Sequence, residues 1–196
     1  MVTFDPKTHT YSKGGVEIPS VTKVLKGCGL IDFSKVPPER LDVALLFGTV
    51  VHKTCELYDK NNLDEKSLDP KLRPYLDGWI KFKKDTQAKT ESIEEQVYSK
   101  LYRYAGTLDR RMILDKHAVV EIKTSVDFHP ANRFQLSAYQ YAYNEHLESR
   151  VGRINDRIAV LLTDEGTYKL EQYRDPMDFN MFLSCLSIYN WKEQNQ

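Results

Sequence analysis

Hydrophobic positions recur with a helical period in the first part of the chain and with a strand period afterwards. A helix is predicted from Pro37-Pro38 to about Lys60, because proline is well tolerated in a first helical turn. A second helix is predicted over residues 70–86. The apolar stripe of the first helix consists of four residues at helical spacing: Val43, Phe47, Val50 and Tyr58.

The first 35 residues or so predict an N-terminal extension that combines a hairpin with a short helix. Residues 3–18 indicate a small β-hairpin that turns near Gly14-Gly15. Ser20 can cap a helix that continues through Leu25 and stops at Gly27.

The second half of the chain predicts a sheet interrupted by one helix. A helix is expected from about Asn132 to Leu147, and another after Asp175, with Asp175 as its cap and Pro176 at its first position. The strands are expected at residues 94–99, 104–114, 118–124, 157–163 and 167–173. This order predicts an α/β (α+β) fold, a central mixed β-sheet flanked by helices in one domain over residues 1–196.

Composition narrows the class of protein. The 196 residues are 41% hydrophobic and 29% charged, which is typical of a folded domain. No apolar run approaches the roughly 18–20 residues that cross a bilayer, and the N-terminus lacks a signal-peptide pattern, so no membrane partner is expected. The three cysteines, Cys28, Cys55 and Cys185, form neither a disulfide framework nor a CxxC metal site, and a cytoplasmic location is expected.

The formal net charge is zero, which by itself gives no support for DNA binding. Basic residues can still cluster locally. The candidates are Arg103, Arg110, Arg111 and Arg133, or the run of residues 81–84.

The stretch from Tyr104 to Ser125 carries the candidate chemistry. Successive side chains of a strand alternate between its faces, so Glu121 and Lys123 project together while Ile122 points into the core. Asp109 lies beside them if its strand pairs with the next one through a short turn. Two carboxylates and an amine then meet on one face of the sheet.

This grouping suits phosphodiester hydrolysis. Mg²⁺ prefers oxygen ligands, and one or two carboxylates are enough to anchor it. A divalent cation polarises the phosphate and activates a water, and Lys123 can orient that water or accept its proton. An ExK pair alone is also typical of an exposed strand face. Here apolar residues 118–120 precede Glu121, which indicates a buried strand where both charges need partners.

Two helices add residues of matching chemistry. Gly48 and His52 are four positions apart, so the glycine lets the helix approach the sheet while His52 offers a nitrogen ligand. Gln135 and Tyr139 share a face of the later helix and suit contacts to phosphate or sugar. A packing histidine and an ordinary amphipathic helix are the alternative interpretations.

The ordered motifs GxxxH, GxxD, ExK and QxxxY resemble the RecB-like branch of the PD-(D/E)xK nuclease superfamily, from about Ser20, where the sequence is similar to phage-type exonucleases, to Tyr143. The resemblance implies a restriction-endonuclease-like core. It implies catalytic roles for Asp109, Glu121 and Lys123, and metal ligation by His52, Asp109, Glu121 and the backbone carbonyl of Ile122. The residues implied on the substrate side are Gln135, Tyr139, Thr124 and Glu95, with Glu94 nearly as good a match as Glu95.

The resemblance also implies a cofactor and partners. Mg²⁺ is expected, with Mn²⁺ able to substitute, and no iron–sulfur cluster, because relatives that hold one use four cysteines. DNA is the expected partner. Phage-type recombination would add a single-strand annealing or other recombination protein, and the chain could form a homo-oligomer.

The expected function is a metal-dependent DNA exonuclease in phage-type recombination, repair or replication. One alternative is an endonuclease that acts on single-stranded or structured DNA. The other is a nuclease-fold protein that binds DNA or a partner without cleavage.

Overall fold

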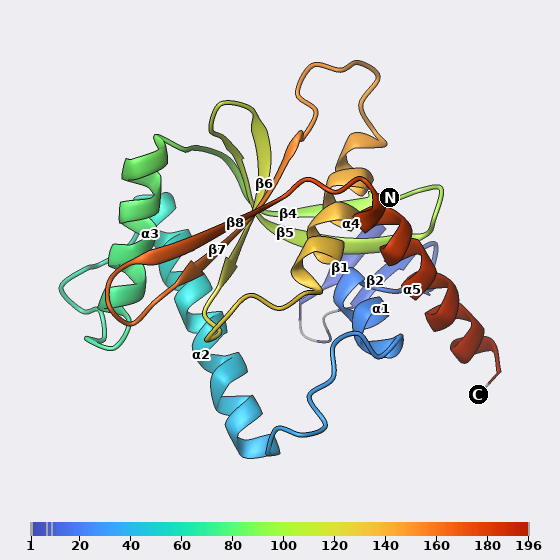
Figure 1. The fold of residues 1–196 in the computed structure, drawn as a ribbon, viewed down its shortest axis with the longest axis horizontal. Coiled ribbons are helices and arrows are strands. Elements are labelled where there is room, and N and C mark those ends of the chain that lie inside the picture. Colours follow the sequence, from blue (N-terminus) through green and yellow to red (C-terminus); the bar gives the residue numbers. More distant parts are fainter. Residues whose placement is uncertain (1, 7, 9, 196) are drawn as a thin grey trace.

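A five-stranded mixed sheet runs through the middle of the structure, a computed structural model that describes residues 2–6, 8 and 10–195 (Figure 1). In sheet order its strands are β4 (Lys89–Ser99), β5 (Tyr104–Ile113), β6 (His117–Lys123), β7 (Asp156–Leu162) and β8 (Tyr168–Tyr173). The strands β6 and β7 are parallel, and the other neighbours are antiparallel. The predicted mixed sheet is therefore confirmed.

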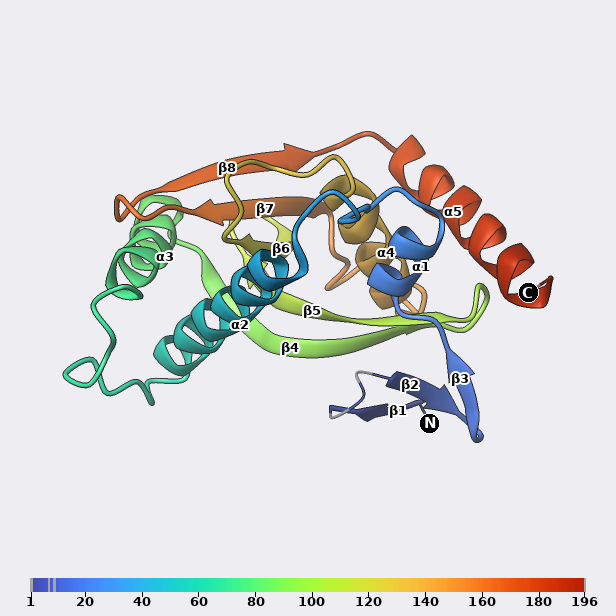
Figure 2. The ribbon, with the colours of Figure 1, turned by 90° about the horizontal axis from the view of Figure 1, so that it is seen from below.

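Helices cover both faces of this sheet (Figures 1 and 2). They are α1 (Val21–Gly27), α2 (Pro38–Asp59), α3 (Arg73–Thr86), α4 (Asn132–Asn144) and α5 (Met177–Gln194). A separate hydrophobic core lies on each face of the sheet, and successive side chains of β6 point into one or the other. Val120 and Ile122 pack with residues of α2 and α3, whereas Val119 packs with residues of α1, α4 and α5. The fold is α/β (α+β), with the sheet between two helical layers. In the part of the chain that the structure describes, no helix is both long and apolar enough to cross a membrane.

The N-terminal segment forms a second, smaller sheet instead of a single hairpin. Its strands are β1 (Val2–Asp5), β2 (Thr10–Lys13) and β3 (Val16–Ile18), all antiparallel. The predicted turn at Gly14-Gly15 joins β2 to β3, and β1 is an additional strand. Ser20 caps α1 as predicted, since its hydroxyl accepts the N–H of Lys23 at 3.1 Å.

Several element boundaries differ from the predictions by one residue, and those of α3, β4 and α4 differ by more, with α3 beginning at Arg73 instead of residue 70. Strand β4 begins at Lys89 instead of residue 94, because Gln87 adopts a left-handed conformation (φ 54°) that turns the chain directly from α3 into the sheet. Helix α4 ends at Asn144, three residues before Leu147. Helix α5 begins at Met177 with Pro176 as its N-cap, so both the predicted cap, Asp175, and the predicted first residue lie one position too early, although Asp175 accepts the N–H of Met177 at 2.9 Å.

The predicted apolar stripe of α2 is partly wrong: Phe47 and Tyr58 pack against the core, whereas Val43 and Val50 do not. The buried residues of this helix are Val51, Thr54 and Cys55, whereas Val43 is 68% exposed and Val50 is 38% exposed. The first half of α2 extends beyond the strands, so only its second half has a sheet to pack against (Figure 1). Helical spacing identifies the helix and leaves open which apolar face is buried.

A buried ion pair holds the end of α2 in place. The Asp59 carboxylate accepts hydrogen bonds from Arg110 Nε at 2.8 Å and from Trp79 Nε1 at 3.1 Å, and Lys83 Nζ lies 2.5 Å away. The side chains of Asp59 and Arg110 are fully buried. This contact joins α2, α3 and β5, and Arg110 is therefore a structural residue, not part of a DNA-binding patch.

Asp59→Ala should lower the free energy of unfolding by about 3–5 kcal/mol, because it leaves the Arg110 guanidinium buried without its anion. Urea unfolding followed by circular dichroism measures the loss. Asp85→Ala is the control, since Asp85 forms an exposed pair with Lys81 at 2.7 Å and should change the free energy of unfolding far less. Equal losses in the two variants would contradict the structural role of Asp59.

Candidate metal and catalytic site

The site begins where β5 and β6 stop exchanging backbone hydrogen bonds. Their ladder pairs Arg110 with Val120, and one step further in the same register Asp109 lies opposite Glu121. The Asp109 carboxylate accepts the N–H of Ile122 at 2.8 Å. The two predicted carboxylates are thus held on neighbouring strands, and both are nearly buried.

Helix α4 adds two more of the predicted residues to the same cluster. Gln135 donates from Nε2 to Glu121 Oε1 at 2.7 Å and to the Tyr139 hydroxyl at 3.1 Å. Lys123 donates from Nζ to Glu121 Oε1 and to Gln135 Oε1, each at 3.1 Å. Gln135 therefore fixes both the glutamate and the lysine, a positioning role that the sequence did not indicate.

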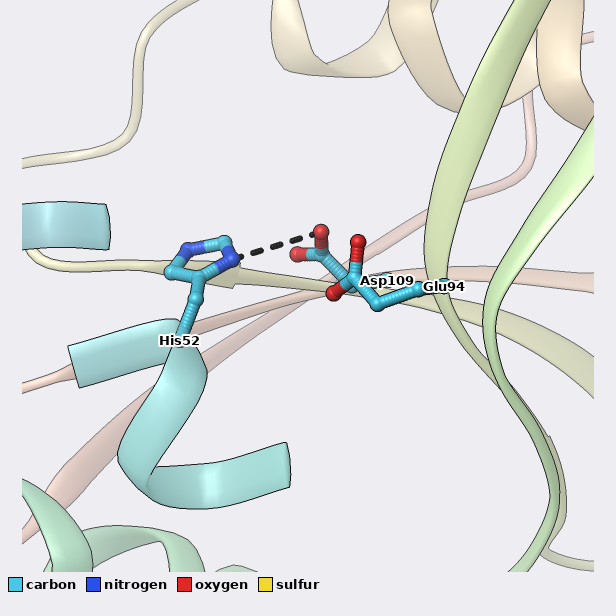
Figure 3. Close-up of side chains that lie close together, drawn as sticks. All are labelled: His52, Glu94 and Asp109. Carbon is cyan, nitrogen blue, oxygen red and sulfur yellow. Dashed lines mark ion pairs between the residues drawn. The ribbon is translucent and has the colours of Figure 1, made fainter. Parts of the chain in front are cut away.

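Helix α2 supplies His52 from the opposite side. Its Nδ1 lies 3.3 Å from Asp109 Oδ1, and the imidazole points towards the carboxylate (Figure 3). Gly48 permits this approach, since a Cβ there would lie 3.3 Å from Thr124 Oγ1. The predicted role of Gly48 as a close-approach residue agrees with this placement, and the predicted substrate-side role of Thr124 stays a prediction.

The structure corrects the choice between the two glutamates of β4. Ligand atoms of His52, Glu94 and Asp109 all lie within 4.8 Å of one another (Figure 3). Glu95 instead accepts hydrogen bonds from Arg111 Nε at 3.0 Å and from Ser92. The register of β4 shifts between Thr90 and Ser92, and Glu94 has a φ of 52°. A one-residue irregularity in a strand changes which of two neighbouring side chains faces the site. The alternation of residues in the sequence does not show where such an irregularity occurs.

Gly106 is a site residue of a different kind. A Cβ at this position would collide with the ring of Tyr139. The glycine of the GxxD motif therefore lets α4 lie against β5, and the motif spacing alone did not show this function.

The pKa values of the cluster are determined mainly by burial and by the proximity of the Asp109 and Glu121 carboxyl groups. Burial and the nearby Asp109 carboxylate raise the pKa of Glu121 to about 7. Burial opposes ionisation of Asp109 as well, but His52 and Lys123 outweigh it and lower the pKa of that carboxyl. Burial alone would lower the pKa of His52, and Asp109 reverses the direction and raises it. Partial burial beside Asp109 also raises the pKa of Glu94.

The residues present fit a divalent cation. Within the described part of the chain, the buried Glu121 Oε2 has no hydrogen-bond partner. His52, Glu94 and Asp109 offer one nitrogen and two oxygen ligands around the same point. A cation at this point would offset the repulsion between the carboxylates, and the unpaired Glu121 oxygen is an additional ligand atom on the neighbouring strand. The carbonyl of Ile122, also expected as a ligand, stays a prediction.

The basic side chains expected to form a DNA-binding patch are largely paired with acids of the same chain. Arg111 lies 2.8 Å from Glu91, and Arg133 lies 2.5 Å from Asp178. Lys81 pairs with Asp85. These charges are therefore compensated within the fold, and they do not mark a surface for a polyanion.

Comparisons with known proteins add little to this geometry. No protein-family model matches the sequence, and no curated protein matches it. Among solved structures, one described as the crystal structure of SSO0001 is similar with a TM-score of 0.45 and 16% sequence identity, over 88% of this chain and 74% of that chain. This similarity is too low to decide family or function.

Glu121→Gln should change the pH dependence of stability in metal-free protein. Because the pKa of Glu121 is raised to about 7 in the folded state, the folded protein binds a proton that the unfolded chain has released. Stability therefore falls as the pH rises from about 4.5 to 7. The variant removes this contribution, so in EDTA its stability should fall less over that interval and exceed that of the wild type at pH 8.

Denaturant unfolding in EDTA between pH 5 and pH 8 measures the effect. Glu165→Gln is the matched control, because Glu165 is exposed in the turn between β7 and β8 and should leave the pH dependence unchanged. A Glu121→Gln variant with the wild-type pH dependence would show that the two carboxylates do not repel each other.

Proposed function

We propose that this chain is a metal-dependent DNA nuclease of the PD-(D/E)xK superfamily, RecB-like branch. The single observation that supports the proposal most is the convergence of Asp109, in the middle of β5, with Glu121 and Lys123, at the end of the adjacent β6, and with His52 facing them. Four sequence motifs that are far apart in the chain contribute to this one cluster. His52 Nδ1 lies 3.3 Å from the buried Asp109 carboxylate, which is where a second ligand of the same cation would lie.

The proposed cofactor is Mg²⁺, with Mn²⁺ as a substitute, held by His52, Asp109, Glu121 and the Ile122 carbonyl. When bound, such a cation would polarise the scissile phosphate and lower the pKa of the attacking water. Glu94 is the additional acidic residue at this place, in the position that the sequence had favoured for Glu95.

The chain's own residues have separate roles in this proposal. Glu121 and Gln135 hold the Lys123 side chain at the site, where its ammonium orients the water or, once deprotonated, its neutral amine accepts the water's proton. Gln135 and Tyr139 supply an amide and a phenol on the substrate side, and Thr124 lies at the end of β6 next to α2. The buried setting strengthens each of these electrostatic contacts.

The finer proposal is an exonuclease that acts in the cytoplasm in phage-type recombination, repair or replication, with a single-strand annealing protein as a further partner. The test is digestion of end-labelled linear DNA and of closed circular DNA with Mg²⁺, with Mn²⁺ and with EDTA. Loss of the linear substrate alone, only with metal, supports an exonuclease. Cleavage of the circular DNA supports an endonuclease. The absence of cleavage with either metal supports the alternative of a protein that binds DNA or a partner without cleavage.

Lys123→Met should lower the cleavage rate by about 10²–10⁴-fold while preserving the fold and metal binding, because the ammonium acts on the water and not on the cation. The rate and the Mn²⁺-induced rise in unfolding temperature are measured together. Lys169→Met, at an exposed position of β8, is the control and should keep the wild-type rate. A Lys123→Met rate within a few-fold of wild type would remove this residue from the mechanism.

His52→Ala should reduce the preference for Mn²⁺ over Mg²⁺, because imidazole binds transition metals better than it binds Mg²⁺. In the wild type, Mn²⁺ should raise the unfolding temperature more than Mg²⁺, and the difference should shrink in the variant. The Mn²⁺ effect should also weaken on acidification, because the raised pKa of His52 favours the protonated ring, which cannot coordinate. His146→Ala, on the exposed surface, should retain the wild-type difference.

A further inference from the structure

Helix α2 has a second apolar face that points away from the rest of the molecule. Val43 is 68% exposed, Leu46 is 66% exposed and Val50 is 38% exposed. The buried residues Val51 and Cys55 lie on the other side of the helix, against the sheet. With about 3.6 residues per turn, the centres of the two sets point about 130° apart around the helix axis. The outward face therefore contributes nothing to the core described above.

The spacing along this face is that of a helix-pairing seam. Steps of four and three residues join its members, which is the pattern of the a and d positions of a coiled coil. We call this set the α2 seam: Glu39, Val43, Leu46, Val50 and Lys53. All five side chains are exposed, and three consecutive apolar positions form its centre.

A hollow lies beside the seam on the same helix. It has a volume of about 490 Å³ and is lined by Glu39, Arg40, Val43, Ala44 and Phe47. Leu46 is not among its lining residues and is exposed to solvent. A helix that offers both a projecting leucine and a hollow can fit a copy of itself, because in a two-fold contact each copy supplies the same patch.

The charges at the two ends of the seam indicate the orientation. Glu39 and Lys53 each lie seven residues from Leu46, on opposite sides. In an antiparallel pair centred on Leu46, Glu39 of one copy therefore lies opposite Lys53 of the other, whereas a parallel pair would bring like charges together.

The seam region does not fit a polyanion. Between residues 38 and 53, the charged residues are Glu39, Arg40, Asp42 and Lys53, which cancel. A DNA-binding surface would need an excess of positive charge. The occupant with complementary chemistry is a second copy of this chain.

We propose that the α2 seam is the interface of an antiparallel homodimer. The seam is short compared with the roughly 1,200–2,000 Å² that a standard interface buries, so the dimer should dissociate on dilution. The inference is independent of the proposed nuclease activity, because no seam residue belongs to the candidate metal and catalytic site.

Sedimentation equilibrium of the full chain over a wide concentration range tests the dimer, in EDTA and without DNA. The wild-type mass should rise with concentration from the 22.8 kDa of one chain towards twice that value. Leu46→Asp should stay at the monomer mass, with an unfolding temperature close to wild type because the site is exposed. Val151→Asp, which is 83% exposed on a distant turn, should dimerise like the wild type.

A wild type that is monomeric at every concentration would overturn the proposal, as would an undiminished dimer of Leu46→Asp. If the wild type stays monomeric and Leu46→Asp weakens binding to DNA, the surface belongs to nucleic acid and the proposal is equally wrong.

Charge exchange tests the orientation. Glu39→Lys and Lys53→Glu should each weaken dimerisation several-fold, because each places like charges opposite one another, and the double variant should restore it. A double variant that is as weak as the single ones would exclude the antiparallel pairing centred on Leu46.

Discussion

The hydrogen bond from the Ile122 N–H to the Asp109 carboxylate is the contact on which the candidate site depends. It fixes one buried acid beside another, Glu121, on the neighbouring strand. Two carboxylates in such a place are unfavourable unless cations and hydrogen-bond donors compensate them. The fold supplies these from three directions: His52 from α2, Lys123 from β6 and Gln135 from α4. Helices α2 and α4 therefore both supply side chains that compensate the same pair of buried carboxylates.

Part of this arrangement could be predicted from the sequence. The alternation of β6 places Glu121 and Lys123 on one face, and the short turn to β5 brings Asp109 beside them, because both follow from local strand geometry. Glu94 could not be chosen over Glu95, since the choice depends on a register shift in β4. The contact of Gly106 with the Tyr139 ring was equally hidden, because it joins residues of two elements far apart in the chain.

Helix α2 combines two kinds of surface along its length. Its second half is anchored by Asp59 to Arg110 and presents His52 to the acids. Its first half extends beyond the sheet and leaves Val43 and Leu46 in water. The prediction from helical periodicity did not distinguish these two faces and assigned residues of both to one apolar stripe. The distinction matters for function, because one face serves the candidate site and the other is free for a partner.

The central claim is that Asp109 and Glu121 form a divalent-cation site together with His52. Anomalous diffraction from crystals soaked in Mn²⁺ tests it most directly. The account predicts an anomalous peak that contacts the Asp109 and Glu121 carboxylates and the His52 imidazole, and that is absent from crystals of Asp109→Ala. A map without a peak between these side chains, in crystals where Mn²⁺ binds elsewhere, would contradict it.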